Sequence, residues 1–250
     1  MKNKIYSCLV VFFCLFLMNC SKDGSSDSKS IAGNSTGGSL ARFTIVGNYL
    51  YTINHQNLKS FNINNPANPI LESEITIGQE IETIYSFKNN LFIGSSTNMY
   101  VYSLANPGKP SVATQLAYWV RGKDPVVAND TVAFSTVRNV SGMGGVLNII
   151  NIKNINSAQL TGSITMQSPY GLGLSDSALY ICEHINGLKV YALSTKTGSI
   201  PTYKKTITNS EIFYDVIPFN NLLYAYIAGG NCIFDISDKM NPVLLSKTKN

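Results

Sequence analysis

The chain has 250 residues, of which 44% are hydrophobic and only 13% are charged, with a formal net charge of +5. Because soluble proteins usually carry charge on about a quarter of their residues, this composition argues against a disordered chain and against a coiled coil. Lys2 and Lys4 lie in a segment expected to be removed, which leaves the mature chain at 5 − 2 = +3. So small an excess predicts one globular domain with no nucleic-acid partner.

The amino terminus is organised like a bacterial export signal. The two lysines precede an apolar run over residues 9–18, which is too short to span a bilayer. The run ends in Leu17-Met18-Asn19-Cys20, which resembles the lipobox of bacterial lipoproteins. This resemblance implies cleavage before Cys20 and acylation of that residue, so residues 1–19 are the predicted signal peptide and the lipid on Cys20 is the predicted membrane anchor. An ordinary secretory signal with a chance cysteine is the alternative.

The residues after Cys20 indicate where the anchor resides. Position 21 is Ser, not the Asp that retains such lipoproteins at the inner membrane, and Ser21-Lys22-Asp23 resembles the export tag of surface-exposed lipoproteins in some Gram-negative bacteria. We therefore expect an outer-membrane, lipid-anchored protein exposed at the cell surface. Residues 20–39 are rich in Ser, Gly and Asp and are expected to form a flexible tether.

Residues 40–250 contain five copies of one unit, which are recognised by three anchors in a fixed order. The first is a hairpin segment whose last residues are Tyr51, Phe92, Ala133, Tyr180 and Tyr224, spaced by 41, 41, 47 and 44 positions. The second anchor is the set Phe61, Tyr102, Ile150, Tyr191 and Phe234. The third is the turn Asn65–Pro69, repeated at 106–110 and, in decayed form, at 238–242.

Each copy holds four short apolar runs, which in the second copy are 84–87, 91–94, 100–104 and 112–116. They are rich in β-branched and aromatic residues, lack a helical period, and are separated by turn-forming residues. Four antiparallel strands in about 42 residues make the blade of a β-propeller. We predict an all-β, five-bladed β-propeller of four-stranded antiparallel blades, at about 40–77, 81–117, 123–166, 170–208 and 213–249. Packing of side chains alone is expected to close the seam between the first and last blades, and the three Tyr residues and Phe92 of the first anchor are expected to be buried.

Three segments give the repeat a family resemblance. Gly47–Tyr51, Ile233–Ser237 and Asn65–Pro69 resemble the hairpin, the third strand and the Pro turn of the LVIVD family of bacterial β-propeller repeats. The resemblance runs from about residue 40 to the end, although the Asp that ends the third strand is kept only as Asp235. It implies the propeller fold and an extracytoplasmic location, and it implies no catalytic activity.

Cys182 and Cys232 are the two cysteines of the predicted domain. A disulfide is permitted outside the cytoplasm, but the alignment puts the two residues in different blades at non-matching positions, so buried thiols are expected. No metal-type Cys spacing is present, and neither a metal nor a cofactor is expected.

The sequence contains none of the common catalytic motifs. Its two histidines, His55 and His184, are expected in turns between the second and third strands of blades 1 and 4. Solvated turn residues are the simpler interpretation of both, although His184 is also a candidate ligand-binding residue at the rim of the channel mouth.

The innermost strands should begin around one mouth of the propeller channel. Counting nine residues back from the first anchors places Arg42, Thr83, Asp124, Gly171 and Asp215 there. Loops of the same rim contribute Glu80, Glu82 and Glu211, the insertion 138–145 and the aromatic residues Tyr118, Trp119, Tyr170, Phe213 and Tyr214. Charged groups beside aromatic rings would suit a cation, a hydroxyl-rich ligand or a protein. A polar, wet channel mouth without a ligand is the alternative.

Three functions remain open from the sequence. The first is a monomeric, non-enzymatic surface module that binds a protein or a glycan. The second is a glycosidase-like enzyme with carboxylates at the channel mouth, and the third is a structural component of an envelope complex. The turns Asp130-Thr131 and Asp176-Ser177 also resemble acceptor sites for O-glycosylation of exported proteins.

Overall fold

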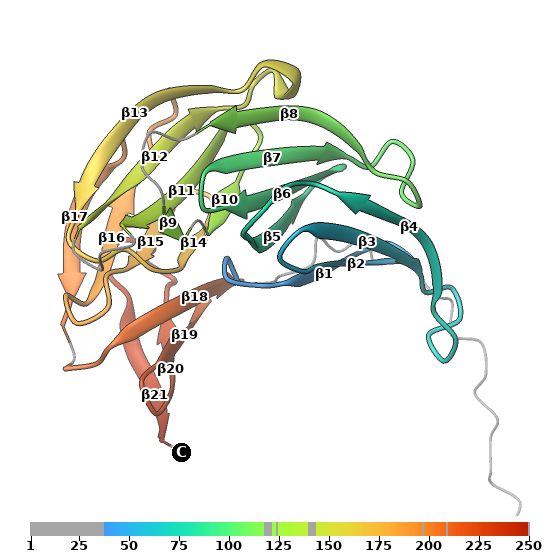
Figure 1. The fold of residues 1–250 in the computed structure, drawn as a ribbon. Helices are drawn as coiled ribbons and strands as arrows, with labels where there is room; N and C mark the ends of the chain where they lie inside the picture. Colours follow the sequence, from blue (N-terminus) through green and yellow to red (C-terminus); the bar gives the residue numbers. More distant parts are fainter. Residues whose placement is uncertain are drawn as a thin grey trace, which may run out of the picture. The chain divides into compact units, whose positions relative to one another are not determined.

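The computed structural model describes residues 38–117, 122–123, 125–139, 144–196, 198–208 and 210–249. These residues lie in the second of two compact units, Ala32–Asn250. The structure confirms an all-β fold of five antiparallel sheets, which follow one another in chain order as blades (Figure 1). The only helical element of the described residues is the 3-10 turn η2 (Ile155–Ser157). The predicted signal peptide, Cys20 and most of the tether lie outside the described residues.

Each blade is a meander in which consecutive strands pair. Blade 1 consists of β1 (Phe43–Val46), β2 (Tyr49–Ile53), β3 (Asn57–Asn62) and β4 (Ile70–Thr76). Blade 2 consists of β5 (Ile81–Phe87), β6 (Asn90–Ser95), β7 (Asn98–Ser103) and β8 (Ser111–Ala117). Blade 3 consists of β10 (Val126–Ala128), β11 (Val132–Asn139), β12 (Gly145–Asn151) and β13 (Gln159–Met166), and the short β9 (Gly122–Lys123) also pairs with β11. Blade 4 consists of β14 (Leu172–Leu174), β15 (Ala178–Cys182), β16 (Leu188–Ala192) and β17 (Thr202–Ile207). Blade 5 consists of β18 (Phe213–Phe219), β19 (Leu222–Ile227), β20 (Gly230–Asp235) and β21 (Val243–Lys249).

The second sequence anchor marks a recurring irregularity of the sheets. In all five blades the pairing of the third and fourth strands shifts register at the anchor residue, and these residues are Phe61, Tyr102, Ile150, Tyr191 and Phe234. A β-bulge adds a residue to one strand and increases the local twist. The repeat therefore encodes the bend of each outermost strand as well as the strand order.

In blade 3 the first anchor of the sequence alignment is shifted by one residue. After each third strand, an amide donates to the carbonyl of the turn between the first two strands, as Ile63 does to Asn48 at 2.8 Å. In blade 3 the acceptor is Thr131, where the alignment would place Asp130. Phe134, rather than Ala133, thus matches Tyr51, because the turn-forming Asp130 had been matched to the turn-forming Asn or Ser of the other copies.

The core lies between blades. Four clusters of buried side chains join blade 1 to 2, 2 to 3, 3 to 4 and 4 to 5. Blade 2 shows the required alternation, because Leu91 and Ile93 face blade 1 while Phe92 faces blade 3. Each inner blade therefore buries both of its faces.

The seam between blades 5 and 1 differs from the prediction. Among the described residues no buried cluster joins these two blades, so apolar packing does not close the seam. Tyr51, Phe92 and Tyr180 are buried as predicted, but Tyr224 is 40% exposed. The prediction for Tyr224 was wrong because its face of blade 5 has no neighbouring blade packed against it.

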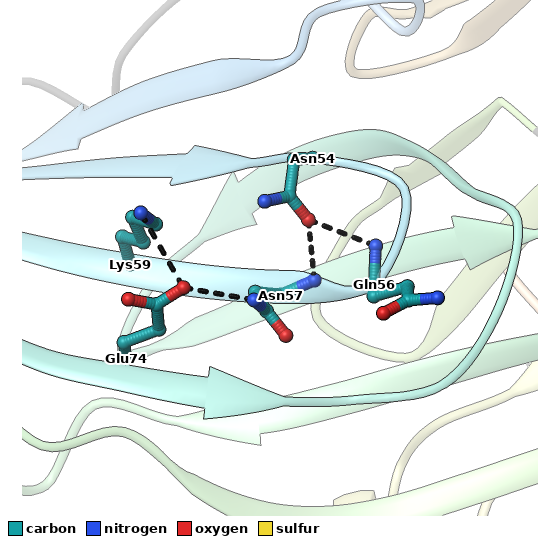
Figure 2. Close-up of polar contacts among 5 residues, drawn as sticks. All are labelled: Asn54, Gln56, Asn57, Lys59 and Glu74. Atoms are coloured by element: carbon teal, nitrogen blue, oxygen red, sulfur yellow. Dashed lines mark hydrogen bonds and ion pairs between the residues drawn. The ribbon is translucent and has the colours of Figure 1, made fainter.

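Side chains of Asn shape several of the tight turns. In the β2–β3 turn of blade 1, Asn54 Oδ1 accepts from the amides of Gln56 and Asn57 at 2.9 and 2.7 Å (Figure 2). Glu74 on β4 accepts from Asn57 Nδ2 and pairs with Lys59 (Figure 2). Asn carboxamides favour turns because they satisfy amides that strand pairing leaves free. His55 lies in this turn, as predicted, and is exposed.

Cys182 and Cys232 are free thiols, as predicted, and both are buried between blades 4 and 5. Burial raises the pKa of each thiol, so both remain neutral packing residues. In the part of the chain that the structure describes, no helix is long and apolar enough to cross a membrane.

Candidate functional site

All five blades contribute to a cavity of about 420 Å³ where the innermost strands begin. We call it the mouth cavity; it is lined by Leu40, Arg42, Glu82, Thr83, Pro125, Arg138, Pro169, Tyr170, Tyr214 and Tyr226. Its size falls in the usual range for small-molecule sites. Among the described residues that line it, Arg42, Arg138 and Glu82 carry formal charges, which sum to one positive charge in excess.

Four rings form a continuous aromatic cluster on the side of blades 4 and 5. The His184 ring stacks on Tyr170, with centroids 4.9 Å apart and planes 12° apart. Tyr214 contacts both rings at 5.7 and 5.5 Å, and Tyr226 extends the cluster at 5.5 Å from Tyr214. The Arg138 guanidinium lies 3.8 Å from the Tyr170 centroid, which is close enough for a cation–π interaction. The cluster therefore combines apolar ring faces with donors and a fixed positive charge.

The backbone fixes the position of this cluster. The Tyr170 amide donates to the Cys182 carbonyl at 2.8 Å, and its carbonyl accepts from the Thr136 hydroxyl at 2.6 Å. His184 has a φ of 53°, in the left-handed region that non-glycine residues seldom adopt. Its carbonyl accepts from the Phe213 amide across the boundary between blades 4 and 5. His184 is therefore a turn residue, as predicted, but it is a stacked and partly buried one.

Asp215, predicted to lie at the channel mouth, accepts hydrogen bonds from the segment before β1. Its Oδ1 accepts from the Ser39 hydroxyl at 2.9 Å and from the Val216 amide, while Oδ2 accepts from the Leu40 amide at 3.3 Å. The Ser39 oxygen also accepts from the Leu172 amide at 2.8 Å. This Ser39–Asp215 clasp ties the segment before β1 to blades 4 and 5. Burial raises the pKa of Asp215 to about 6, although the hydrogen bonds act in the opposite direction.

The predicted site residues separate into three groups. Arg42, Thr83, Tyr170 and His184 belong to the mouth cavity or its aromatic cluster. Asp215 holds the clasp and lines a second cavity, on blade 5. Tyr118, Trp119 and Asp124 lie outside the described residues, and Pro125 occupies the position in blade 3 that Asp124 was expected to occupy. Phe213, expected at the rim, is fully buried between blades 4 and 5.

Counting strand starts could not find Tyr226. It lies two residues beyond the first anchor of blade 5, on the face that a neighbouring blade was expected to cover, yet it is 56% exposed. The signal that could have identified it is the Tyr-x-Tyr pair 224–226, because none of the other four copies has a tyrosine two residues after its first anchor. Among the described residues, no three His, Cys, Asp or Glu side chains gather as metal ligands.

Part of blade 5 is similar to a known family of repeats. Residues 223–249 match the model of the LVIVD repeat. This match confirms the family resemblance read from the sequence for residues 223–249. The same register shift between the third and fourth strands recurs in the other four blades.

The solved structures to which the chain is similar support the fold. A protein from Lactobacillus plantarum is 10% identical, with a TM-score of 0.62, over 81% of this chain and 68% of that one. The periplasmic gluconolactonase of Pseudomonas aeruginosa is 11% identical, with a TM-score of 0.63, over 81% of this chain and 68% of that one. The computationally designed protein Ika8 is 12% identical, with a TM-score of 0.60, over 82% of this chain and 60% of that one. No curated protein matches by sequence. At these identities the similarity concerns the fold alone, and each of these three solved chains is longer than the part matched here.

Proposed function

We propose that the propeller is a glycan-binding module and that the mouth cavity is its binding site. The observation that supports this is the aromatic cluster of Tyr170, His184, Tyr214 and Tyr226 beside Arg42 and Arg138. Sugars present apolar C–H faces to aromatic rings and hydroxyl groups to charged and polar side chains. The excess positive charge of the lining favours a sugar that carries a carboxylate, such as a uronic acid.

The carboxylates of the site argue for binding rather than hydrolysis. A glycosidase of the usual kind needs two carboxyl groups that flank the scissile bond. Glu82 is the carboxylate of the described residues that lines the mouth cavity, whereas the carboxylate of Asp215 is engaged by Ser39, Leu40 and Val216. Because one carboxylate of the described residues lines the mouth cavity, binding is the function that we propose for it.

Titration calorimetry with uronic-acid oligosaccharides and with neutral oligosaccharides of equal length tests this function. We expect the acidic series to bind more tightly, and Arg42→Ala to weaken that binding by about tenfold because it removes a charge-assisted contact. Arg42 is exposed, so this variant should fold normally. Tyr203→Ala is the matched control, because Tyr203 is 52% exposed on β17 and does not line the mouth cavity. Absence of binding to either series, or equal loss in both variants, would refute the proposal.

We further propose that the module is presented at the cell surface by a lipid on Cys20. The support is the sequence Leu17-Met18-Asn19-Cys20 with its preceding apolar run and the Ser21-Lys22-Asp23 segment after it. Several acyl chains would give stable attachment to a membrane. Cys20→Ser is expected to move the protein from the membrane pellet to the soluble fraction, and Cys182→Ser is the control that leaves it in the pellet. Digestion of the wild-type protein by a protease added to intact cells tests the outward orientation.

A further inference from the structure

A polar contact recurs where consecutive blades meet. The Tyr51 hydroxyl on β2 donates to the Pro107 carbonyl at 2.9 Å, in the turn before the outermost strand of blade 2. The Tyr180 hydroxyl on β15 donates to the Lys239 carbonyl at 2.9 Å, in the matching turn of blade 5. In both cases the second residue of the turn is the acceptor. The contact therefore occurs at two of the four blade contacts, and at the other two the matching residues, Phe92 and Phe134, have no hydroxyl group.

Tyr224 is a third tyrosine at the same position, but its ring is not covered. It pairs with Ile233 as Tyr51 pairs with Ser60 and Tyr180 with Val190. Tyr51 and Tyr180 have no exposed surface, whereas Tyr224 is 40% exposed, and no partner of its hydroxyl is found among the described residues.

An apolar surface surrounds this tyrosine. A cavity of about 600 Å³ lies over the same face of blade 5, and its apolar walls include Ile217, Tyr224 and Ile233. We call this surface the open face of blade 5. Asp215, Asn231 and Thr248 add polar groups to its lining, and Leu40 of the segment before β1 also lines it.

Blade 1 carries the complementary half of such an interface. The Asn65–Pro69 turn of blade 1 has the same hydrogen bond as the two acceptor turns, because the Asn68 amide donates to the Asn65 carbonyl at 3.0 Å. In the two acceptor turns the matching bonds run from Lys109 to Asn106 at 3.1 Å and from Asn241 to Asp238 at 3.0 Å. Pro66 holds the position of Pro107 and Lys239. Phe43 and Ile45 on β1 are 61% and 42% exposed, although Leu172, which matches Phe43 in blade 4, is fully buried by blade 3.

We propose that the open face of blade 5 binds blade 1 of a second copy of this chain, head to tail, with the Tyr224 hydroxyl donating to the Pro66 carbonyl of the second copy. The same kind of interface already joins consecutive blades within one chain. Each copy carries both of the faces that would meet, one on blade 5 and one on blade 1. If blade 5 met blade 1 of the same molecule, the angles between neighbouring blades would have to change at all four buried clusters. Such a change costs free energy because the side chains of a protein core are close-packed. Two different faces meet in this association, which is therefore heterologous. It differs from the monomeric state expected from the sequence.

Sedimentation velocity over a concentration series tests the association, with the unlipidated Cys20→Ser chain as the reference. We expect reversible, concentration-dependent assembly that Tyr224→Arg and Phe43→Arg each weaken by about tenfold or more. Val112→Arg is the matched control, because Val112 is 59% exposed on β8 and belongs to neither face. A reference chain that stays monomeric throughout, or a control that weakens assembly equally, would overturn the proposal.

Cross-linking then identifies the contact. Tyr224→Cys and Ala67→Cys are introduced in separately tagged chains, which are mixed and treated with a short bifunctional maleimide; the native Cys182 and Cys232 are buried and remain unmodified. The expected product is a dimer that carries both tags, absent when either variant is treated alone. If a chain with both substitutions gives only an internal cross-link and no mixed dimer, the two faces meet within one molecule and the proposal is wrong.

Discussion

A single carboxyl group connects the segment before β1 with blades 4 and 5. Asp215 accepts hydrogen bonds from Ser39, Leu40 and Val216, and Ser39 itself has only 1% of its surface exposed. The residue retains some exposed surface, yet its carboxylate is enclosed enough for burial to raise the pKa to about 6. Gly171 makes room for this carboxylate, because a side chain at that position would overlap Asp215.

The raised pKa of Asp215 predicts how the free energy of unfolding depends on pH. Between about pH 4 and pH 6 the folded chain keeps a proton that the unfolded chain has released, so unfolding becomes easier as pH rises through this interval. The loss should be about 2 kcal/mol, reduced from the full linkage value because the residue is partly exposed. Denaturant unfolding of wild type and Asp215→Asn at several pH values checks this. The difference between the two proteins should vary below pH 6 and be constant above it; a constant difference throughout would contradict the assignment.

At the scale of elements, the close approach of β14 and β18 makes Gly171 a critical position. A Cβ at Gly171 would overlap the Asp215 carboxylate and lie 2.8 Å from the Tyr214 carbonyl, which is backbone and cannot rotate away. We expect Gly171→Ala to lower the free energy of unfolding by about 1–3 kcal/mol. Gly162→Ala is the control, because its Cβ would meet Ile200 at an ordinary 3.5 Å. Equal stability of the two variants in chemical denaturation would contradict the proposed crowding.

The strands show what the sequence could and could not predict. The five copies and their four-strand order follow from hydrophobic runs and turn residues, which act locally and leave a direct pattern. The one-residue error in blade 3 arose because Asp130 and Thr131 are both acceptable in a turn, so turn chemistry alone did not fix the register there. Arg42, Thr83 and Tyr170 line the mouth cavity, and counting strand starts along the repeat indicates that location for Arg42 and Thr83. Tyr226 and the engagement of Asp215 depend on contacts between distant blades, and no local pattern encodes those.

At the scale of the whole described unit, blade number and blade angle are separate properties. The sequence determines the number, because each copy is one sheet. The angle between neighbouring blades depends on how the side chains of the four core clusters pack. Among the described residues, one face of blade 1 and one face of blade 5 have no neighbouring blade packed against them. The clasp joins only the segment before β1 to blades 4 and 5. A repeat protein whose units gain stability from neighbours should therefore be least stable where a neighbour is missing.

Native-state hydrogen exchange tests this distribution of stability. Blade 4 shares buried clusters with both of its neighbours, whereas the described residues of blade 5 share one with blade 4 alone, so local opening of β19 and β20 should require less free energy than opening of β15 and β16. The comparison is internal, because both pairs are central strands of four-stranded sheets in the same chain. At low protein concentration we expect faster exchange in β19 and β20, and in β2 of blade 1 for the same reason. Raising the concentration should slow exchange in blades 1 and 5 and leave blade 3 unchanged, since association covers only the two end faces. Uniform protection in all five blades at every concentration would mean that the end blades already have neighbours, which contradicts both the open seam and the proposed docking.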